Sequence, residues 1–269
     1  MKIKFLGAAS GIVTGSSYVL TSGSGKSILI DLGMFQGIPE IDKLNYEPFN
    51  FDPSKLTGAV LTHAHLDHCG RLPIIIPRGF SGNIWMTPPT HDLTELSLFD
   101  TAKIARHSDK PILFDDEQVL KTINKFKTVN YHESFEIGDF SIKMFDAGHI
   151  LGSTYLEIID KNPSSEIKRI VFSGDLGNSP EPLEKATEIL NSTDALVMES
   201  TYGDRIHPTG NAAETVQAEI KQIEKSGGTL LIPAFSLERT QELLHMIMHL
   251  KKEGKVLGQI PIYLDSPMA

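Results

Sequence analysis

The feature that most restricts the fold is a cluster of residues that commonly bind metal ions, directly after a short apolar strand. Residues 61 to 70 read LTHAHLDHCG, so three histidines and one aspartate, His63, His65, Asp67 and His68, occupy six positions. On an extended chain, His63 and His65 are two residues apart and project to the same side, where they can chelate one ion. Asp67 and His68 follow as the chain turns toward a helix, so they point to a second position. The pattern predicts two neighbouring cation sites at a sheet edge.

Three other segments end a strand with an acid or an imidazole. They contain Asp31 in LIDLG, His149 in AGHILG and Asp175 in FSGDLG. Because a sheet brings strand ends together, we expect His149 to add a third imidazole to the first site. Asp175 has two carboxylate oxygens and is expected to bridge both ions. Asp31 is expected to orient a histidine or a water from outside the ligand set.

The type of ligand indicates the chemistry. Imidazoles and carboxylates without a thiolate favour zinc, with manganese and iron as open alternatives. Two ions roughly 3.5 to 4 Å apart can hold a hydroxide and stabilise both the entering and the leaving oxygen of a displacement. The sequence therefore predicts hydrolysis by a metal-bridging hydroxide, and we expect Asp67 to orient this hydroxide in addition to binding metal.

Each of these residues also has an ordinary structural interpretation. A single buried histidine is usually a core residue with a hydrogen bond, and a loop aspartate such as Asp175 often caps backbone amides. Four ligand-type residues in six positions do not fit that interpretation. Cys69, beside the cluster, is interpreted as a small buried hydrophobe. Five further histidines lie in no comparable frame and are assigned to surfaces or helices: His91, His107, His132, His245 and His249.

Composition limits the partners and the location. The chain has 25 basic and 34 acidic residues and a formal net charge of −9, so no overall positive field gathers nucleic acid, and a polyanion must be held locally. A single cysteine excludes an internal disulfide framework and fits a reducing compartment. No run approaches the about 18 apolar residues that a membrane helix needs. We therefore expect a soluble cytoplasmic protein without membrane contact.

The order of predicted elements changes near residue 208. The first part contains an antiparallel meander followed by a strand ending at the cluster, helices at 90–107 and 115–127, and further strands up to about 200. The second part reads helix at 212–225, strand at 227–234, helix at 236–252 and strand at 261–266. The predicted organisation is one domain over residues 1–208 and the opening βαβ part of another over residues 209–269.

Several motifs together resemble a known family. THAHLDHCG, with GH at 148–149 and SGD at 173–175, resembles the metallo-β-lactamase superfamily. GAASGIVTGSSYVL, IDLGMFQG, MESTYGDRIHP, IPAFSLERTQELL and YLDSPMA resemble its β-CASP branch of RNA-processing nucleases. The resemblance runs from residue 6 to the last residue. It implies the α/β fold class, with a metallo-β-lactamase αββα sandwich and the start of an inserted β-CASP α/β domain, two zinc ions and an RNA substrate.

The resemblance also assigns roles to individual residues. Asp31 matches the first motif of the branch, the cluster matches the second, His149 the third and Asp175 the fourth. Glu199, in MESTYG, matches the acid that marks the branch, and in the family that acid partners a later histidine that protonates the leaving oxygen. The implied catalytic residues are Asp67 and Glu199. The implied metal ligands are His63, His65, Asp67, His68, His149 and Asp175.

The sequence departs from the family pattern at its end. After the inserted domain, the family returns to the lactamase fold and supplies the partner histidine and a last metal-binding histidine, and neither has a match within these 269 residues. We therefore expect residues 1–208 to lack the C-terminal return of their domain and the sequence to be part of a longer chain. We also expect weak metal occupancy and poor activity for residues 1–269 alone.

Two other functions stay open at this point. One is a metal-dependent hydrolase of small esters, thioesters or lactams, although MESTYGDR and the βαβ extension favour RNA. The other is a catalytically silent scaffold subunit, against which stands the presence of every metal ligand expected in this span. A homodimer, internal or terminal cleavage, the RNA target and the native metal are left open.

Overall fold

The computed structural model describes residues 1–163, 165–177, 183, 185–206, 210–266 and 268–269. The chain forms two compact units, one made by residues 1–180 and 184–199 and the other by residues 181–183 and 200–269. The boundary predicted near residue 208 lies outside the described residues. Among the residues that are described, no helix has both the length and the apolar character needed to cross a membrane.

The first unit contains a six-stranded sheet whose strands follow one another in chain order. β1 and β2 are antiparallel, as are β2 and β3, which confirms the predicted meander. From β3 to β6 the neighbours run parallel, so their carboxyl ends meet at one edge. The strands are β1 (Lys2–Phe5), β2 (Ser17–Thr21), β3 (Ser27–Leu32), β4 (Leu56–Val60), β5 (Ile84–Met86) and β6 (Phe126–Thr128).

A second sheet of five strands has the order β11-β10-β9-β8-β7. All its neighbouring strands are antiparallel except β10 and β11, which run parallel. In β8, every second side chain is buried, which is the period expected when one face of a sheet packs on a core. The strands are β7 (Ser134–Ile137), β8 (Phe140–Asp146), β9 (Thr154–Asp160), β10 (Arg169–Phe172) and β11 (Ala195–Val197).

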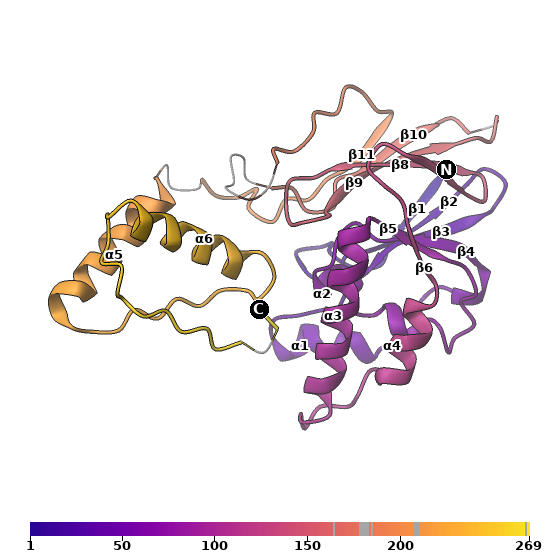
Figure 1. Ribbon diagram of the computed structural model, residues 1–269. Helices are drawn as coiled ribbons and strands as arrows, with labels where there is room; N and C mark the ends of the chain where they lie inside the picture. Colours follow the sequence, from indigo (N-terminus) through magenta and orange to yellow (C-terminus); the bar gives the residue numbers. More distant parts are fainter. Residues whose placement is uncertain (164, 178–182, 184, 207–209, 267) are drawn as a thin grey trace. The chain divides into compact units, whose positions relative to one another are not determined.

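The helices and the two sheets of this unit form layers (Figure 1). Two hydrophobic cores join these layers. Between the sheets, side chains such as Leu20 and Ile30 of the first sheet pack against Phe140 and Leu156 of the second. Burying each side chain of this size contributes about 1.5–3 kcal/mol. On the other face of the first sheet, a second core joins sheet residues such as Leu29 to helix residues such as Leu98 and Val119. The described layers are thus helix, sheet and sheet, which confirms the predicted α/β class and sandwich. The second helix layer of the predicted αββα order is not seen among the described residues of this unit.

The two longer helices of the first unit, α3 and α4, begin at residues whose side chains cap them. Thr87 caps α3 by accepting a hydrogen bond from the backbone N–H of Thr90, and Pro88 occupies the first turn. Asp115 and Gln118 form a reciprocal capping box at the start of α4. The helices are α1 (Pro39–Asp42), α2 (Leu66–Cys69), α3 (Pro88–Ala105) and α4 (Asp116–Ile123), with short 3-10 helices at Lys43–Tyr46, Pro53–Lys55 and Leu72–Ile74.

The second unit contains α5 (Ala212–Ser226) and α6 (Arg239–Lys252), close to the two predicted helices. Ile220 of α5 and Ile247 and Leu250 of α6 form its small core. The segments 227–234 and 261–266, predicted as strands, are not strands in the structure. A strand requires a hydrogen-bonded neighbour, which an apolar run alone does not supply. The βαβ order is therefore present here only through its helices.

Candidate metal centre

The candidate ligands come from three segments of the first unit. His63 and His65 follow β4, and His65 is the N-cap residue of the four-residue helix α2, which carries Asp67 and His68. The backbone of His65 is extended, so the chain turns only after it, as the spacing predicts. His149 lies in the loop between β8 and β9, and Asp175 follows β10. The structure brings all six predicted ligands together in two overlapping groups.

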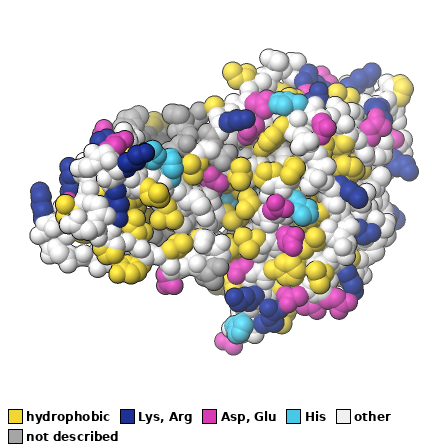
Figure 2. Space-filling model, in the orientation of Figure 1, with side chains coloured by type: hydrophobic (Ala, Val, Ile, Leu, Met, Phe, Trp, Pro, Cys, Tyr) yellow, Lys and Arg dark blue, Asp and Glu magenta, His cyan; other side chains and the backbone are white. Residues whose placement is uncertain are grey.

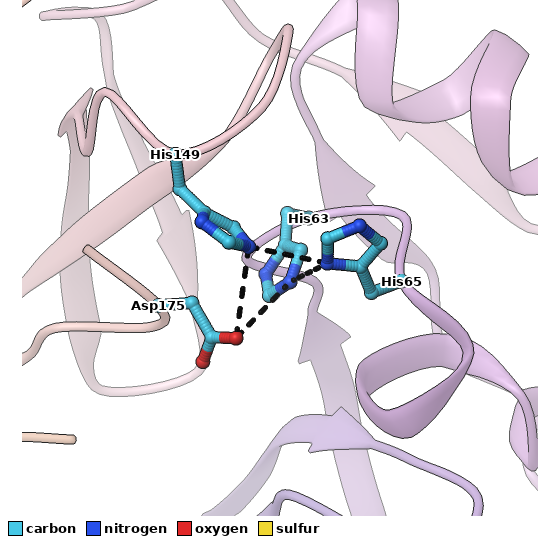
Figure 3. Close-up of side chains that lie close together, drawn as sticks. All are labelled: His63, His65, His149 and Asp175. Atoms are coloured by element: carbon cyan, nitrogen blue, oxygen red, sulfur yellow. Dashed lines mark hydrogen bonds and ion pairs between the residues drawn. The ribbon is translucent and has the colours of Figure 1, made fainter. Parts of the chain in front are cut away.

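Three imidazoles and one carboxylate form the first group (Figure 3). His65 Nδ1 lies 3.2 Å from His63 Nε2 and 3.1 Å from His149 Nε2. Asp175 Oδ2 lies 3.8 Å from His63 Nε2 and 3.7 Å from His149 Nε2. The four ligand atoms therefore converge on one point, although the four residues come from three separate loops.

The nitrogen–nitrogen distances of the first group fit a tetrahedral ion. Zinc–nitrogen bonds of about 2.0–2.1 Å place two nitrogens of a tetrahedral site about 3.3 Å apart. The nitrogen–nitrogen distances of 3.1 and 3.2 Å are close to that value. Three imidazole nitrogens so close together also need a shared proton or a cation between their lone pairs. The donor set and its spacing therefore suit a divalent ion.

Asp67, His68 and Asp175 form the second group. His68 Nε2 lies 3.1 Å from Asp175 Oδ1, whereas the other oxygen of Asp175 faces the first group. One carboxylate thus offers a different oxygen to each group. This is the arrangement that a bridging ligand requires.

Asp31 contacts His68, the histidine of the second group, at the ring nitrogen that does not face Asp175. Its Oδ2 lies 2.8 Å from His68 Nδ1, and both carboxylate oxygens accept hydrogen bonds from Thr62, one from the backbone N–H and one from the hydroxyl. A proton on His68 Nδ1 leaves Nε2 with the lone pair that a metal ligand needs. The contact agrees with the expectation that Asp31 orients a histidine, and Asp31 belongs to neither ligand group.

Thr62 is a participant that the sequence analysis did not identify. Its Oγ1 donates to Asp31 and lies 3.1 Å from His63 Nδ1. If His63 Nδ1–H donates to this hydroxyl, His63 Nε2 keeps the lone pair that faces the first group. Thr62 and Asp31 together therefore orient one histidine of each group. The only sequence signal was the position of Thr62 directly before the cluster.

Two glycines let the ligand loops approach closely. A Cβ atom on Gly33 would lie 1.5 Å from the carbonyl oxygen of Asp67, and one on Gly177 would lie 1.5 Å from that of Gly148. Neither position can hold a side chain without moving a ligand loop. Ser153 Oγ fixes the second of these loops by accepting a hydrogen bond from the backbone N–H of His149.

Glu199 contacts the loop of Asp175 and is in neither ligand group. Its Oε1 accepts a hydrogen bond of 2.8 Å from the backbone N–H of Leu176, and its own N–H donates to Ser173 Oγ at 3.0 Å. These two bonds hold the residues on either side of Asp175. Cys69 is buried, its Sγ faces the Ala64 carbonyl oxygen at 3.3 Å, and burial raises the pKa of its thiol, which fits the predicted role as a small hydrophobe.

Burial and neighbouring charges separate the pKa values of the site. Burial is the main cause that lowers the pKa of His63, His65 and His149, that of His65 to about 4. For His68, burial works in the same direction, but the carboxylates of Asp175 and Asp31 hold its pKa well above the usual range. Burial would raise the pKa of Asp175, yet the charge of His68 and its hydrogen bond lower it to about 2.

These shifts predict how the stability of the metal-free protein depends on pH. In the unfolded chain His65 titrates near pH 6.5, whereas in the folded chain its pKa is about 4. Between these values the unfolded chain binds the proton, so the free energy of unfolding should fall as pH falls from 6.5 toward 4. His68 acts oppositely, since its contribution is present below pH 6.5 and is lost as pH rises through its folded pKa.

Urea unfolding of chelator-treated protein at a series of pH values measures this slope. The variant His65→Ala should show a shallower fall between pH 6.5 and 4, because it lacks one of the titrating groups. An unfolding free energy that stays constant or rises as the pH is lowered over this range would contradict the prediction.

Comparison with known proteins adds the family. Residues 11–198 match the model of the metallo-beta-lactamase superfamily, a span that contains all six ligand residues together with Asp31 and Thr62. The chain belongs to the metallo-β-lactamase superfamily. A solved structure of a protein of unknown function from Enterococcus faecalis, 14% identical, covers 93% of this chain, while 62% of that protein is covered, with a TM-score of 0.52. That likeness concerns the fold alone.

Several curated relatives of this metallo-β-lactamase chain carry names of RNA enzymes. Ribonuclease TTHA0252 of Thermus thermophilus is 39% identical across 100% of the chain, which spans 59% of that relative. RNase aCSPSF2 of Saccharolobus solfataricus is 37% identical across 91% of the chain and 48% of the relative. Cleavage and polyadenylation specificity factor subunit 3-I of Arabidopsis thaliana is 32% identical across 98% of the chain and 37% of the relative. The predicted resemblance to RNA-processing nucleases of the β-CASP branch is confirmed.

The chain thus spans between about a third and three fifths of the length of these relatives. Family membership and the histidine–aspartate groups support a metal-dependent hydrolase that binds divalent metal. The number of ions, their identity and the substrate are matters for the proposal that follows.

Proposed function

We propose that the chain holds the catalytic centre of a ribonuclease that hydrolyses RNA phosphodiester bonds with two divalent metal ions, zinc in the first instance. The observation that carries this proposal is the position of Asp175, whose two oxygens face two different ligand groups 3.1 to 3.8 Å away. The relatives named as ribonucleases support RNA as the substrate.

Each ion has its own set of residues in this proposal. His63, His65 and His149 would hold the first ion, Asp67 and His68 would hold the second, and Asp175 would contribute one oxygen to each. Ions bound there supply an activated water nucleophile and neutralise the charge of the attacked phosphate. The residues of the chain keep these ligands in the required tautomers and positions, chiefly through Asp31 and Thr62.

Two carboxylates are proposed to handle protons. The carboxylate of Asp67 has two oxygens, so one can contact the second ion while the other accepts a hydrogen bond and a proton from water. Asp67 is therefore suited to orient the attacking water and to take its proton. Glu199 is proposed to support the group that protonates the leaving oxygen, in addition to holding the backbone beside Asp175.

The two roles of Glu199 can be separated by substitution. Glu199→Gln keeps an oxygen that accepts from the Leu176 N–H but removes the negative charge. We expect RNA cleavage to fall about 100-fold, the lower end of what acid–base groups contribute, while the metal content stays unchanged. Metal content and single-turnover cleavage are measured on the same samples. If Glu199→Gln cleaves at the wild-type rate, the residue only positions the loop.

The charge of the chain requires that RNA be held near the centre itself. On the face of the first unit that Figure 2 shows, basic side chains are interspersed with acidic ones. With a net charge of −9, long-range attraction of a polyanion is absent. The cations of the proposed centre then supply the main attraction for the reacting phosphate, which reconciles an acidic chain with a nucleic-acid substrate.

The same metal centre would also suit small esters, thioesters or lactams, so the substrate needs a direct test. The intact natural protein is incubated with end-labelled RNA and, separately, with a chromogenic ester, before and after metal removal by a chelator. We expect RNA cleavage that the chelator abolishes and added zinc or manganese restores. Ester hydrolysis without RNA cleavage would overturn the proposal, and metal binding without either activity would indicate a scaffold subunit.

A further inference from the structure

A second cluster of histidine nitrogens lies in the other compact unit. His245 and His249 are one helical turn apart on α6, with their Nε2 atoms 3.1 Å apart and their ring centroids 4.4 Å apart. His249 is exposed and His245 is half-buried. Neither residue belongs to the ligand groups around Asp175, which lie in the first unit.

The two histidines are placed as in a bidentate chelate, in which two side chains bind one ion. Residues four apart on a helix are neighbours on its surface, so the helix itself holds the two rings together. Their Nε2 separation of 3.1 Å is close to the about 3.3 Å between two nitrogens of a tetrahedral zinc site. Two nitrogens at this distance must share either a proton or a cation, because two bare lone pairs repel each other.

We propose that His245 and His249 bind an additional divalent transition-metal ion through their Nε2 atoms, with water completing the coordination. Zinc and copper are among the ions that imidazole ligands suit. Copper(II) should bind more tightly than zinc because it ranks higher in the usual affinity order. The site does not depend on the proposed ribonuclease function, since it uses none of the same residues.

The strength of this site should differ from that of the centre at Asp175. Two imidazoles and water provide fewer protein ligands than three imidazoles and a carboxylate, and the ring of His249 is open to solvent. The ion on α6 should therefore exchange faster and be removed by milder chelation. As a consequence, elemental analysis at high metal concentration counts one ion more than the Asp175 centre holds.

The test compares metal titrations of the intact natural protein with those of two variants. Protein stripped by a chelator is titrated with zinc chloride alone and, separately, with copper(II) chloride alone, and binding is followed by calorimetry. Wild type should show a weaker class of one ion in addition to the tight class. In His245→Ala and in His249→Ala this weaker class should bind at least about 10-fold more weakly, while the tight class is unchanged.

The substitutions are chosen so that folding is preserved. Alanine has a higher helix propensity than histidine, so either change favours α6, and circular dichroism verifies this. His107→Ala is the matched control, because it removes an exposed histidine just after α3 that has no histidine one turn away. An unchanged weaker class in both α6 variants would overturn the proposal and leave the 3.1 Å contact as a proton shared between two neutral rings.

Discussion

Asp175→Ala is expected to lower the rate of RNA cleavage more than about 100-fold while the protein stays folded. Loss of a partner outside the ligand set commonly reduces metal affinity or activity 10- to 100-fold, and a ligand to both ions should cost more than that. Asp175 Oδ1 faces His68 and Oδ2 faces His63 and His149, so one substitution removes an oxygen from each group. The side chain is about a quarter exposed, so alanine leaves little buried space.

The experiment uses the intact natural protein and measures single-turnover cleavage of labelled RNA together with bound metal for the same preparation. Asp194→Ala is the matched control, because Asp194 accepts hydrogen bonds at the start of β10, whereas Asp175 follows the end of the same strand. This control should keep its metal and its activity. Cleavage by Asp175→Ala within tenfold of wild type would show that the proposed shared ligand is wrong.

Asp31→Asn is expected to lower metal affinity about 10- to 100-fold although Asp31 is not a ligand. Asp31 is 1% exposed, and its Oδ2 accepts from Thr62 and faces His68 Nδ1. An asparagine has one oxygen and one donor group, so it cannot accept hydrogen bonds at both positions. Its NH₂ group facing His68 favours the tautomer with the proton on Nε2, which removes the lone pair that binds metal.

Asparagine also suits the backbone at this position. The φ angle of residue 31 is +52°, in the left-handed region that asparagine and aspartate tolerate better than most residues, so the substitution should not strain the strand. Metal affinity is measured by competition with a chromophoric chelator. Asp92→Asn is the control, because Asp92 contacts His91 Nδ1 at 2.9 Å on the surface. Equal affinities for Asp31→Asn and wild type would show that this contact does not set the tautomer.

The strands of the first sheet show which strands can be predicted from the periodicity of the sequence and which cannot. Alternation and turn residues indicated β1 to β4, because each has enough residues to show a pattern. Ile84–Met86 and Phe126–Thr128 have three residues each, and the second was included in a predicted helix at 115–127. Strands this short exist because neighbouring strands supply hydrogen bonds, which the local sequence does not reveal.

By itself, the sequence determined which chemical groups are present and where each strand delivers them. The spacing of the cluster indicated that His63 and His65 point to one position and that Asp67 and His68 point to a second. His149 and Asp175 follow the ends of β8 and β10. These are local properties, because two-residue periodicity in a strand and a turn into a helix depend on neighbouring residues.

Only the tertiary structure decided how these groups meet. Asp31 and His68 are 37 residues apart in the chain, and His65 and His149 are 84 apart. Contacts over such separations depend on the order of strands in the sheet. They also depend on loops that pack so closely that no Cβ atom fits between them, as at Gly33 and Gly177. Which oxygen of Asp175 faces which group, and which histidine Asp31 holds, therefore follows from packing of distant segments rather than from any local pattern.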